Sequence, residues 1–156
     1  VHEKLCHGCY DEVRWQKGER PGTFKKGFYG VGLNVGLPPE DVADEVKFIC
    51  DELCNAELLN TDSVIKAASW FHCSFERIHT FADGNGRVGR TLLNYILMCN
   101  DLPPVIIFDE DKETYFMALE VFDHTDKIDG FVQFLKEQTV KTWVRKTPKG
   151  KEFIAL

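Results

Sequence analysis

Apolar residues recur at helical intervals through most of this chain. One set, Val42, Val46, Ile49, Cys50 and Leu53, follows Pro38-Pro39 and predicts a helix over about residues 39–54. A second set lies at positions 64, 67, 68, 71, 75 and 78, after the N-cap candidates at 61–63. It predicts a helix that ends directly before His79.

The same periodicity predicts the later helices. Apolar spacing from Val88 to Cys99 indicates a helix that Asn100 to Pro104 stops. Residues 111–123 and 129–145 form the last two predicted helices, the second starting at Asp129-Gly130. Residues 1–18 predict one short amphipathic helix around Leu5 and Trp15.

The segment 20–36 has a different pattern. A turn signal at 18–22 is followed by aromatic residues mixed with Gly27 and Gly30, and then by the glycine-rich 32–36. Glycine weakens a strand or marks a close backbone approach, so the segment predicts a short β-hairpin, called the flap below. The expected fold is therefore an all-α bundle with core helices over about 39–145 and a small hairpin.

Length, charge and composition indicate which classes of protein the chain can belong to. A chain of 156 residues with 44% hydrophobic content can bury one sizeable core, so we expect a single domain over 1–156. The formal net charge of −6 argues against a general nucleic-acid binder, which needs a basic face. No run reaches the roughly 18–20 apolar residues of a membrane span. We expect no membrane partner and a cytoplasmic location.

The six cysteines fit a reduced compartment, because four of them fall in predicted helices, where free cysteine behaves as a small apolar residue. Cys6 and Cys9 have C-x-x-C spacing, which suits zinc or redox chemistry. No second ligand pair follows at zinc-finger spacing. Two ordinary thiols are favoured, with metal binding as the alternative.

One run concentrates the chemistry of the chain. It places a base, a carboxylate, a glycine-flanked amide and two guanidinium groups in His79-Thr80-Phe81-Ala82-Asp83-Gly84-Asn85-Gly86-Arg87-Val88-Gly89-Arg90. The glycines lie between two predicted helices, so the run forms a loop that ends at a helix N-terminus. Unpaired backbone N–H groups and the positive end of the helix dipole gather there. The run predicts a phosphate-binding loop.

Each residue type in the run has a chemical reading and a plainer one. His79 suits a general base, although an isolated histidine is more often a core residue. Asp83 suits Mg²⁺ beside phosphates, or caps a turn. Arg87 and Arg90 are three residues apart, so both can face one anion or simply meet solvent.

The run resembles the signature of the Fic family, His-x-Phe-x-[Asp/Glu]-Gly-Asn-Gly-Arg-x-x-Arg, and matches it at every specified position. Residues 20–32 resemble the family's flap region, and the segments 92–94 and 102–104 resemble its downstream helix and turn. The resemblance covers most of the chain. It implies the compact helical Fic-type bundle and a protein adenylyltransferase, which moves AMP from ATP to a Ser, Thr or Tyr hydroxyl of a target protein and releases pyrophosphate.

The resemblance also implies a role for each motif residue. His79 would be the general base, Asp83 would hold Mg²⁺, and Phe81 would be a core plug that fixes the loop. Phosphates of ATP would be bound by Gly84, Asn85, Gly86, Arg87 and Arg90, with the Asn85 amide on the α-phosphate and the arginines on the β- and γ-phosphates. The flap would bind the target through Thr23, Phe24, Phe28 and Tyr29, although simple packing of these aromatic residues is about as plausible.

Many Fic enzymes carry an inhibitory [Ser/Thr]-x-x-x-Glu-[Gly/Asn] helix, and no Ser or Thr in this chain has Glu four residues later. An inhibitory partner, an arm preceding Val1, or no restraint would each account for this. Alternatives on the same scaffold are transfer of another nucleotide or of phosphate, and removal of AMP. A non-catalytic module that binds nucleotide or protein is the alternative from another class.

Overall fold

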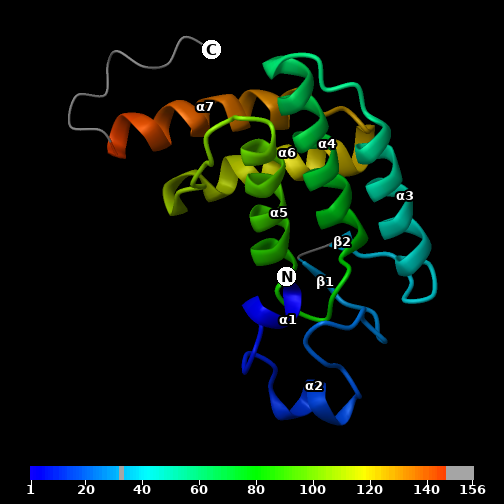
Figure 1. Cartoon of the computed structure of the whole chain (residues 1–156). Coiled ribbons are helices and arrows are strands. Elements are labelled where there is room, and N and C mark those ends of the chain that lie inside the picture. The colour runs from blue at the N-terminus through cyan, green and yellow to red at the C-terminus, as the bar shows by residue number, and fades with distance from the viewer. Residues whose placement is uncertain (32–33, 147–156) are drawn as a thin grey trace. The chain divides into compact units, whose positions relative to one another are not determined.

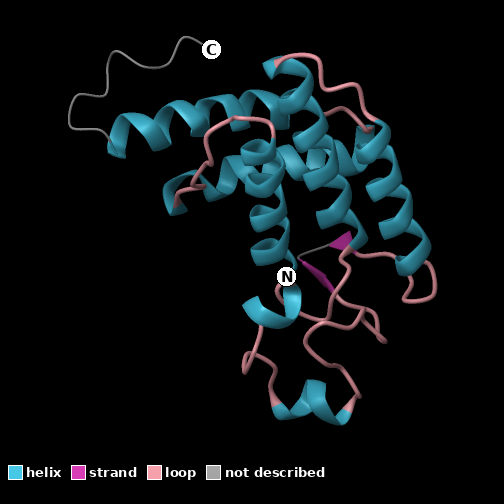
Figure 2. Ribbon diagram, in the orientation of Figure 1, coloured by secondary structure: helices cyan, strands magenta, loops and turns pink. Residues whose placement is uncertain are grey.

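The computed structural model describes residues 1–31 and 34–146, and these are mainly helical (Figures 1 and 2). The helices are α1 His2–Leu5, α2 Glu12–Gln16, α3 Val42–Asn55, α4 Thr61–Ile78, α5 Asn85–Cys99, the 3-10 helix η1 Asp109–Asp111, α6 Lys112–Thr125 and α7 Asp129–Lys146. The all-α prediction is confirmed.

The strands β1 Gly30–Val31 and β2 Asn34–Val35 lie within the predicted flap and pair antiparallel, with Gly30 opposite Val35 (Figure 2). Each strand has two residues. Residues 32–33 of the predicted flap lie outside the described part of the chain. Most of the flap is therefore loop, as its glycine content leads one to expect.

Two compact units divide the chain. The first contains Val1–Ala56 and Ser74–Leu93, and the second contains Glu57–Cys73 and the residues from Asn94 onward. Helices α4 and α5 each contribute to both units, because the dividing points fall within them. The prediction of a single domain stays a prediction.

The prediction of one helix over residues 1–18 is wrong. Two short helices, α1 and α2, form there instead. Gly8 between them has φ +71°, a left-handed conformation that an α-helix excludes. Asp11 then caps α2, accepting a hydrogen bond from the Arg14 backbone N–H at 2.8 Å. The chain between α1 and α2 is thus a turn.

Helix α4 starts on a reciprocal cap. The Ser63 N–H donates to the Asn60 side-chain oxygen, and the Asn60 N–H donates to the Ser63 hydroxyl oxygen, each at 3.0 Å. The predicted cap lay at 61–63, so Asn60 is the residue that the sequence pattern missed. Helix α5 begins at Asn85, three residues before the predicted Val88, so it includes the second half of the motif.

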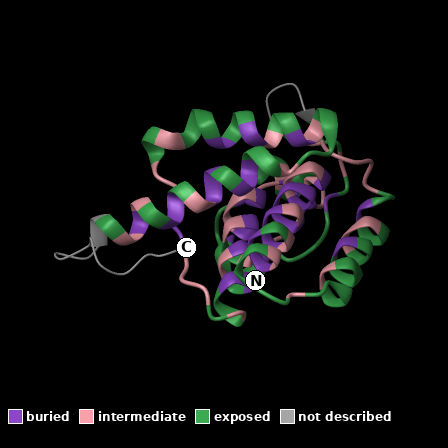
Figure 3. Cartoon of the chain, turned by 90° about the horizontal axis from the view of Figure 1, so that it is seen from above, coloured by how far each residue is buried: buried purple, intermediate pink, exposed green. Residues whose placement is uncertain are grey.

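Each unit has its own buried side chains. In the first unit, Val42 and Ile49 of α3 are buried, and so are Phe75, Ile78 and Phe81 around the end of α4. In the second unit α6 and α7 pack together, and an aromatic cluster forms from Tyr115, Phe131 and Phe134. Figure 3 shows the resulting alternation of buried and exposed positions along the helices. None of the described helices is long and apolar enough to cross a membrane.

Candidate active site

His79 is the first residue after α4 and has a left-handed backbone, with φ 52°. This conformation is uncommon for a residue with a side chain and marks a site that its surroundings hold in place. Its N–H donates to the Glu76 carbonyl oxygen at 3.2 Å, which closes the helix end. The position of His79 is therefore fixed by the C-terminus of α4.

The flap holds this helix end through hydrogen bonds. The Lys25 ammonium and the Leu37 N–H both donate to the Ile78 carbonyl oxygen, at 3.2 and 3.1 Å. The Lys25 N–H donates to the Thr80 carbonyl oxygen at 3.1 Å. Lys25 of the flap and Leu37, the residue directly after the flap, thus contact the chain on both sides of His79, and Lys25 is only 2% exposed.

Gly36 explains how the flap can approach so closely. A Cβ atom at this position would lie 2.3 Å from the His79 Cβ and 2.8 Å from the Ile78 carbonyl oxygen. Both distances are shorter than non-bonded atoms tolerate. A residue without a side chain is therefore required beside the candidate base.

The environment of His79 keeps its imidazole neutral. Burial, together with the positive charge of Lys25, lowers the pKa of His79 to about 4, against the opposing effect of Asp83. A neutral imidazole has a free nitrogen lone pair at physiological pH. His79 can therefore accept a proton, as a general base must.

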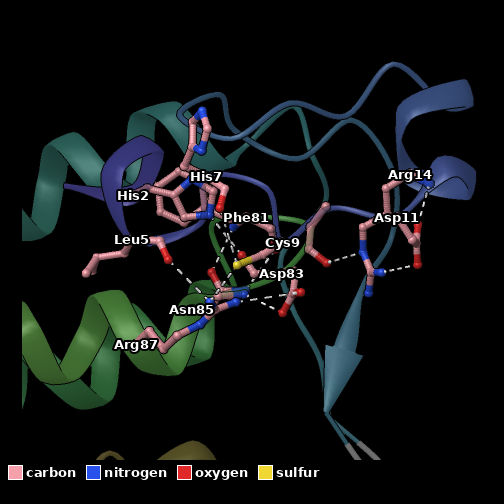
Figure 4. A network of polar contacts seen from close by, with 12 residues as sticks. His2, Leu5, His7, Cys9, Asp11, Arg14, Phe81, Asp83, Asn85 and Arg87 are labelled. Atoms are coloured by element: carbon pink, nitrogen blue, oxygen red, sulfur yellow. Dashed lines mark hydrogen bonds and ion pairs between the residues drawn. The ribbon is translucent and has the colours of Figure 1, made fainter.

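The loop after His79 is closed by Asn85. The buried Asn85 amide accepts from the Phe81 N–H and donates to the Phe81 carbonyl oxygen, each at 2.8 Å (Figure 4). Phe81 is itself buried and contacts the rings of Phe24 and Phe75, which fits its predicted role as a core plug. The Asn85 amide retains one further N–H, so its predicted contact with an α-phosphate stays a prediction.

Asp83 and Gly84 form the turn into α5. The Gly84 N–H donates to the Asp83 carboxylate at 2.6 Å, and Gly84 has φ +83°. The Cys6 sulfur packs on the open face of Gly84, only 2.3 Å from where a Cβ would stand. Glycine is therefore required here for its backbone conformation and for the space that Cys6 fills.

The two motif arginines have different neighbours. Arg87 donates to the Leu5 carbonyl oxygen at 3.3 Å and to the Cys9 sulfur at 3.2 Å, and its guanidinium lies 3.8 Å from the Asp83 carboxylate (Figure 4). Arg90 lies over Gly86, with one terminal nitrogen 2.9 Å from where a Cβ would stand. Both arginines lie in the first two turns of α5, and their predicted binding of phosphates stays a prediction.

The structure shows how many possible metal ligands surround Cys6, Cys9 and Asp83. Among residues 1–31 and 34–146, no three His, Cys, Asp or Glu side chains gather as a metal site, so Cys6 and Cys9 lack further ligands there. All six cysteines are free thiols. Asp83 is a single, partly exposed carboxylate. A single carboxylate can serve Mg²⁺, which keeps most of its waters, so the predicted role of Asp83 toward the metal stays a prediction.

Of the four predicted target-binding residues, three are exposed and one is partly buried. Phe28 and Phe24 are exposed, by 67% and 40%, and so are free to meet another molecule. Thr23 is exposed and donates to the Arg20 carbonyl oxygen. Tyr29 is partly buried and packs against a small cluster of Cys6, Tyr10 and Ala82. Their role toward a target stays a prediction.

Sequence reasoning missed four polar residues of this unit. His2, Glu19 and Lys25 are each at most 4% exposed, and a Glu76 carboxylate oxygen is buried without a hydrogen-bond partner. Glu19 accepts from the N–H groups of Lys26 and Gly27, so it orders the flap. Burial raises the pKa of Glu76 to about 7, with Arg90 acting in the opposite direction.

The sequence model of the Fic/DOC family matches residues 1–97, which include the flap, α3, α4 and the whole motif. The chain belongs to the Fic/DOC family. Its predicted membership is therefore confirmed.

Fic relatives give further comparisons. The chain is 35% identical over 109 residues to protein adenylyltransferase fic-1 of Caenorhabditis elegans, covering 70% of this chain and 21% of that protein. It is 35% identical over 121 residues to protein adenylyltransferase Fic of Drosophila willistoni, covering 78% and 24%. The chain therefore spans less than a quarter of the length of these relatives.

Solved Fic structures share the fold. A Fic family protein from Desulfovibrio desulfuricans superposes with a TM-score of 0.72 at 28% identity, over 90% of this chain and 43% of that one. A Fic domain containing signaling protein from Bacteroides thetaiotaomicron gives a TM-score of 0.70 at 24% identity, over 80% and 53%. At that lower identity the likeness concerns the fold alone.

Proposed function

We propose that this chain catalyses protein adenylylation, the transfer of AMP from ATP to a Ser, Thr or Tyr hydroxyl of a target protein, with release of pyrophosphate. The observation that carries the proposal is the position of His79, which follows α4 at the helix end that the flap contacts and precedes the loop that leads into the N-terminus of α5. The names of the relatives, which are protein adenylyltransferases, support the same reaction class.

In the proposed reaction His79 removes the proton of the target hydroxyl as its oxygen bonds to the α-phosphorus of ATP. The bond between that phosphorus and the bridging oxygen to the β-phosphate breaks, and pyrophosphate leaves with the electron pair. Backbone N–H groups at the start of α5 stabilise the charge on the α-phosphate. Arg87 and Arg90 bind the β- and γ-phosphates as cations at the same helix start.

Asp83 is the residue that would hold Mg²⁺. The metal would supply charge neutralisation for the phosphates when bound. Of the two Asp83 oxygens, one accepts the Gly84 N–H and the other faces Arg87 at 3.8 Å. The flap residues Thr23, Phe24, Phe28 and Tyr29 would bind the target segment, with exposed Phe28 the first candidate for a side-chain contact.

Intact mass spectrometry tests the proposal. The purified chain is incubated with ATP and Mg²⁺, alone and with cell lysate, beside His79→Ala and a matched His124→Ala control on the exposed face of α6. We expect one AMP mass on the chain or on a lysate protein, reduced about 10²–10⁴-fold by His79→Ala and unchanged by His124→Ala. A phosphate mass would replace adenylylation by phosphorylation, and modification unaffected by His79→Ala would overturn the role of His79.

A further inference from the structure

His2 makes three contacts with the motif loop and the flap. Its ring stacks on Phe81, with 3.7 Å between the ring centroids and 11° between the planes. Its Nδ1 accepts the Gly22 N–H at 2.8 Å. Its Nε2 lies 2.9 Å from the Asp83 carbonyl oxygen, and Figure 4 shows His2 beside Asp83. The side chain is 4% exposed, so these contacts replace water almost completely.

The two partners of His2 determine its tautomer. A backbone N–H can only donate, so Nδ1 must carry the lone pair that accepts from Gly22. A carbonyl oxygen can only accept, so Nε2 must carry the proton and donate to Asp83. One form of the ring therefore satisfies both partners, and His2 links Gly22, 20 residues away in the sequence, with Asp83, 81 residues away.

The bond to Asp83 acts on a single peptide group. The Asp83 carbonyl and the Gly84 N–H belong to the same planar unit, and that N–H donates to the Asp83 carboxylate at 2.6 Å. Rotation of this peptide would turn the N–H away from the carboxylate. Gly84 has no Cβ to resist such a rotation, because glycine tolerates both signs of φ. The hydrogen bond from His2 opposes it.

We propose that His2 is a positioning residue that locks the Asp83–Gly84 peptide, and so fixes the direction of the Asp83 carboxylate and of the loop N–H groups. The inference rests on the proposed function for the use of that carboxylate toward Mg²⁺. The lock itself is a property of the loop. Groups that orient a metal-binding side chain without touching the metal commonly change metal affinity 10- to 100-fold.

Three substitutions of His2 separate its ring stacking from its two hydrogen bonds. His2→Phe keeps a ring to stack on Phe81 and removes both hydrogen bonds. His2→Gln offers an amide N–H near the position of Nε2, toward Asp83, whereas His2→Asn offers an oxygen near the position of Nδ1, toward Gly22. His7→Phe, at an exposed position on the same segment, is the matched control.

Calorimetric titration with a non-hydrolysable ATP analogue at varied Mg²⁺ measures the proposed effect. We expect His2→Phe and His2→Asn to raise the Mg²⁺ concentration for half-maximal binding about tenfold. We expect His2→Gln to restore it substantially, and His7→Phe to leave it unchanged. Binding in EDTA should change little in every variant. Equal Mg²⁺ dependence in all four, or a dependence that simply follows the loss of thermal stability, would overturn the proposal.

Hydrogen exchange of the Gly84 amide provides a readout that needs neither metal nor nucleotide. If His2 locks the peptide, this amide exchanges about tenfold faster in His2→Phe and returns toward the wild-type rate in His2→Gln. Unchanged exchange in His2→Phe would defeat the lock. Failure of the wild-type chain to bind the analogue, with the exchange result as expected, would defeat the proposed function and leave the lock standing.

Discussion

The side chain of Lys25 donates a hydrogen bond to the carbonyl oxygen of Ile78, at 3.2 Å, although 53 residues separate them in the sequence. Ile78 is the last residue of α4, and the next residue is His79. The buried ammonium therefore occupies one of the free carbonyls at the helix end and places a positive charge close to the candidate base.

This charge predicts an effect of Lys25 on the titration of His79. Lys25→Met removes a repulsion of the protonated imidazole, so the pKa of His79, about 4 in the wild type, should rise. The acid limb of the transfer rate should then move to higher pH, since the base becomes protonated sooner. Histidine NMR titration, with His79→Ala for assignment, measures the pKa directly. Lys25→Arg retains the charge and should leave it near the wild-type value; an unchanged pKa in Lys25→Met would contradict the electrostatic argument.

Gly36 predicts a strict steric requirement. Gly36→Ala would bring a Cβ to 2.3 Å from the His79 Cβ, and should destabilise the fold by about 1–3 kcal/mol or force the flap outward. Gly130→Ala is the control, because a Cβ there meets no atom within 4 Å and replaces glycine in the first turn of α7. Alanine at 130 should be neutral or stabilising by up to ~1 kcal/mol. Urea unfolding measures the free energy of unfolding of both variants. Equal values would show that the flap can move away from His79 at no cost in stability, which would contradict the steric requirement.

Glu76 predicts a stability difference that depends on pH. The folded pKa of about 7 exceeds the ordinary 4.5, so Glu76 favours folding most below pH 4.5 and loses that contribution as pH rises through about 7. Gln resembles the protonated carboxyl. Glu76→Gln should therefore stabilise the chain by roughly 1–3 kcal/mol at pH 8 and have little effect near pH 4.5.

Chemical denaturation at pH 4.5 and pH 8 measures the Glu76 effect. Glu113→Gln, at an exposed position of α6, is the control and should change stability little and equally at both values. The comparison of each variant with the wild type at the same pH removes the contribution of His79, whose lowered pKa makes the fold less stable as pH falls from 6.5 toward 4. A Glu76→Gln effect that does not differ between the two pH values would refute the assignment.

Asn85 and Asn94 make the same kind of contact in different units. Asn94 accepts from the Val105 N–H at 2.7 Å and donates to its carbonyl oxygen at 3.0 Å, as Asn85 does with Phe81. Asn85→Ala and Asn94→Ala should each lose about 2–4 kcal/mol, because both leave backbone groups without partners. Only Asn85→Ala should also weaken binding of an ATP analogue, measured where both variants remain folded. Equal weakening would mean that Asn85 acts through stability alone.

Periodicity predicted the long helices well because a buried face repeats every three to four residues within one segment. The pattern over 129–145 corresponds to α7 at 129–146, and the one ending at 78 to α4. Contacts between distant segments left no such signal. Asp83 lies 81 residues from His2 and Ile78 lies 53 residues from Lys25, so neither hydrogen bond could be predicted from a local pattern.

The family was predictable for a different reason. The motif residues lie within twelve positions, so their types and order alone match the family signature. The orientation of each side chain was not predictable, because Arg87 and Asp83 take their positions from the segment that contains α1. The contacts that position the motif residues come from the N-terminal segment and the flap.

The packing of Cys6 on Gly84 makes the rate of thiol labelling of Cys6 a measure of loop opening. Cys6 is 0% exposed, so a thiol reagent reaches it only when the loop opens, whereas exposed Cys9, Cys50, Cys54 and Cys99 react at once. The labelling rate of Cys6, followed by mass spectrometry, therefore measures how often the loop around Gly84 opens in the native chain. Buried Cys73 in the second unit reports the opening of its own surroundings in the same sample. A nucleotide that slows Cys6 and leaves Cys73 unchanged would reveal its binding place without any assay of turnover.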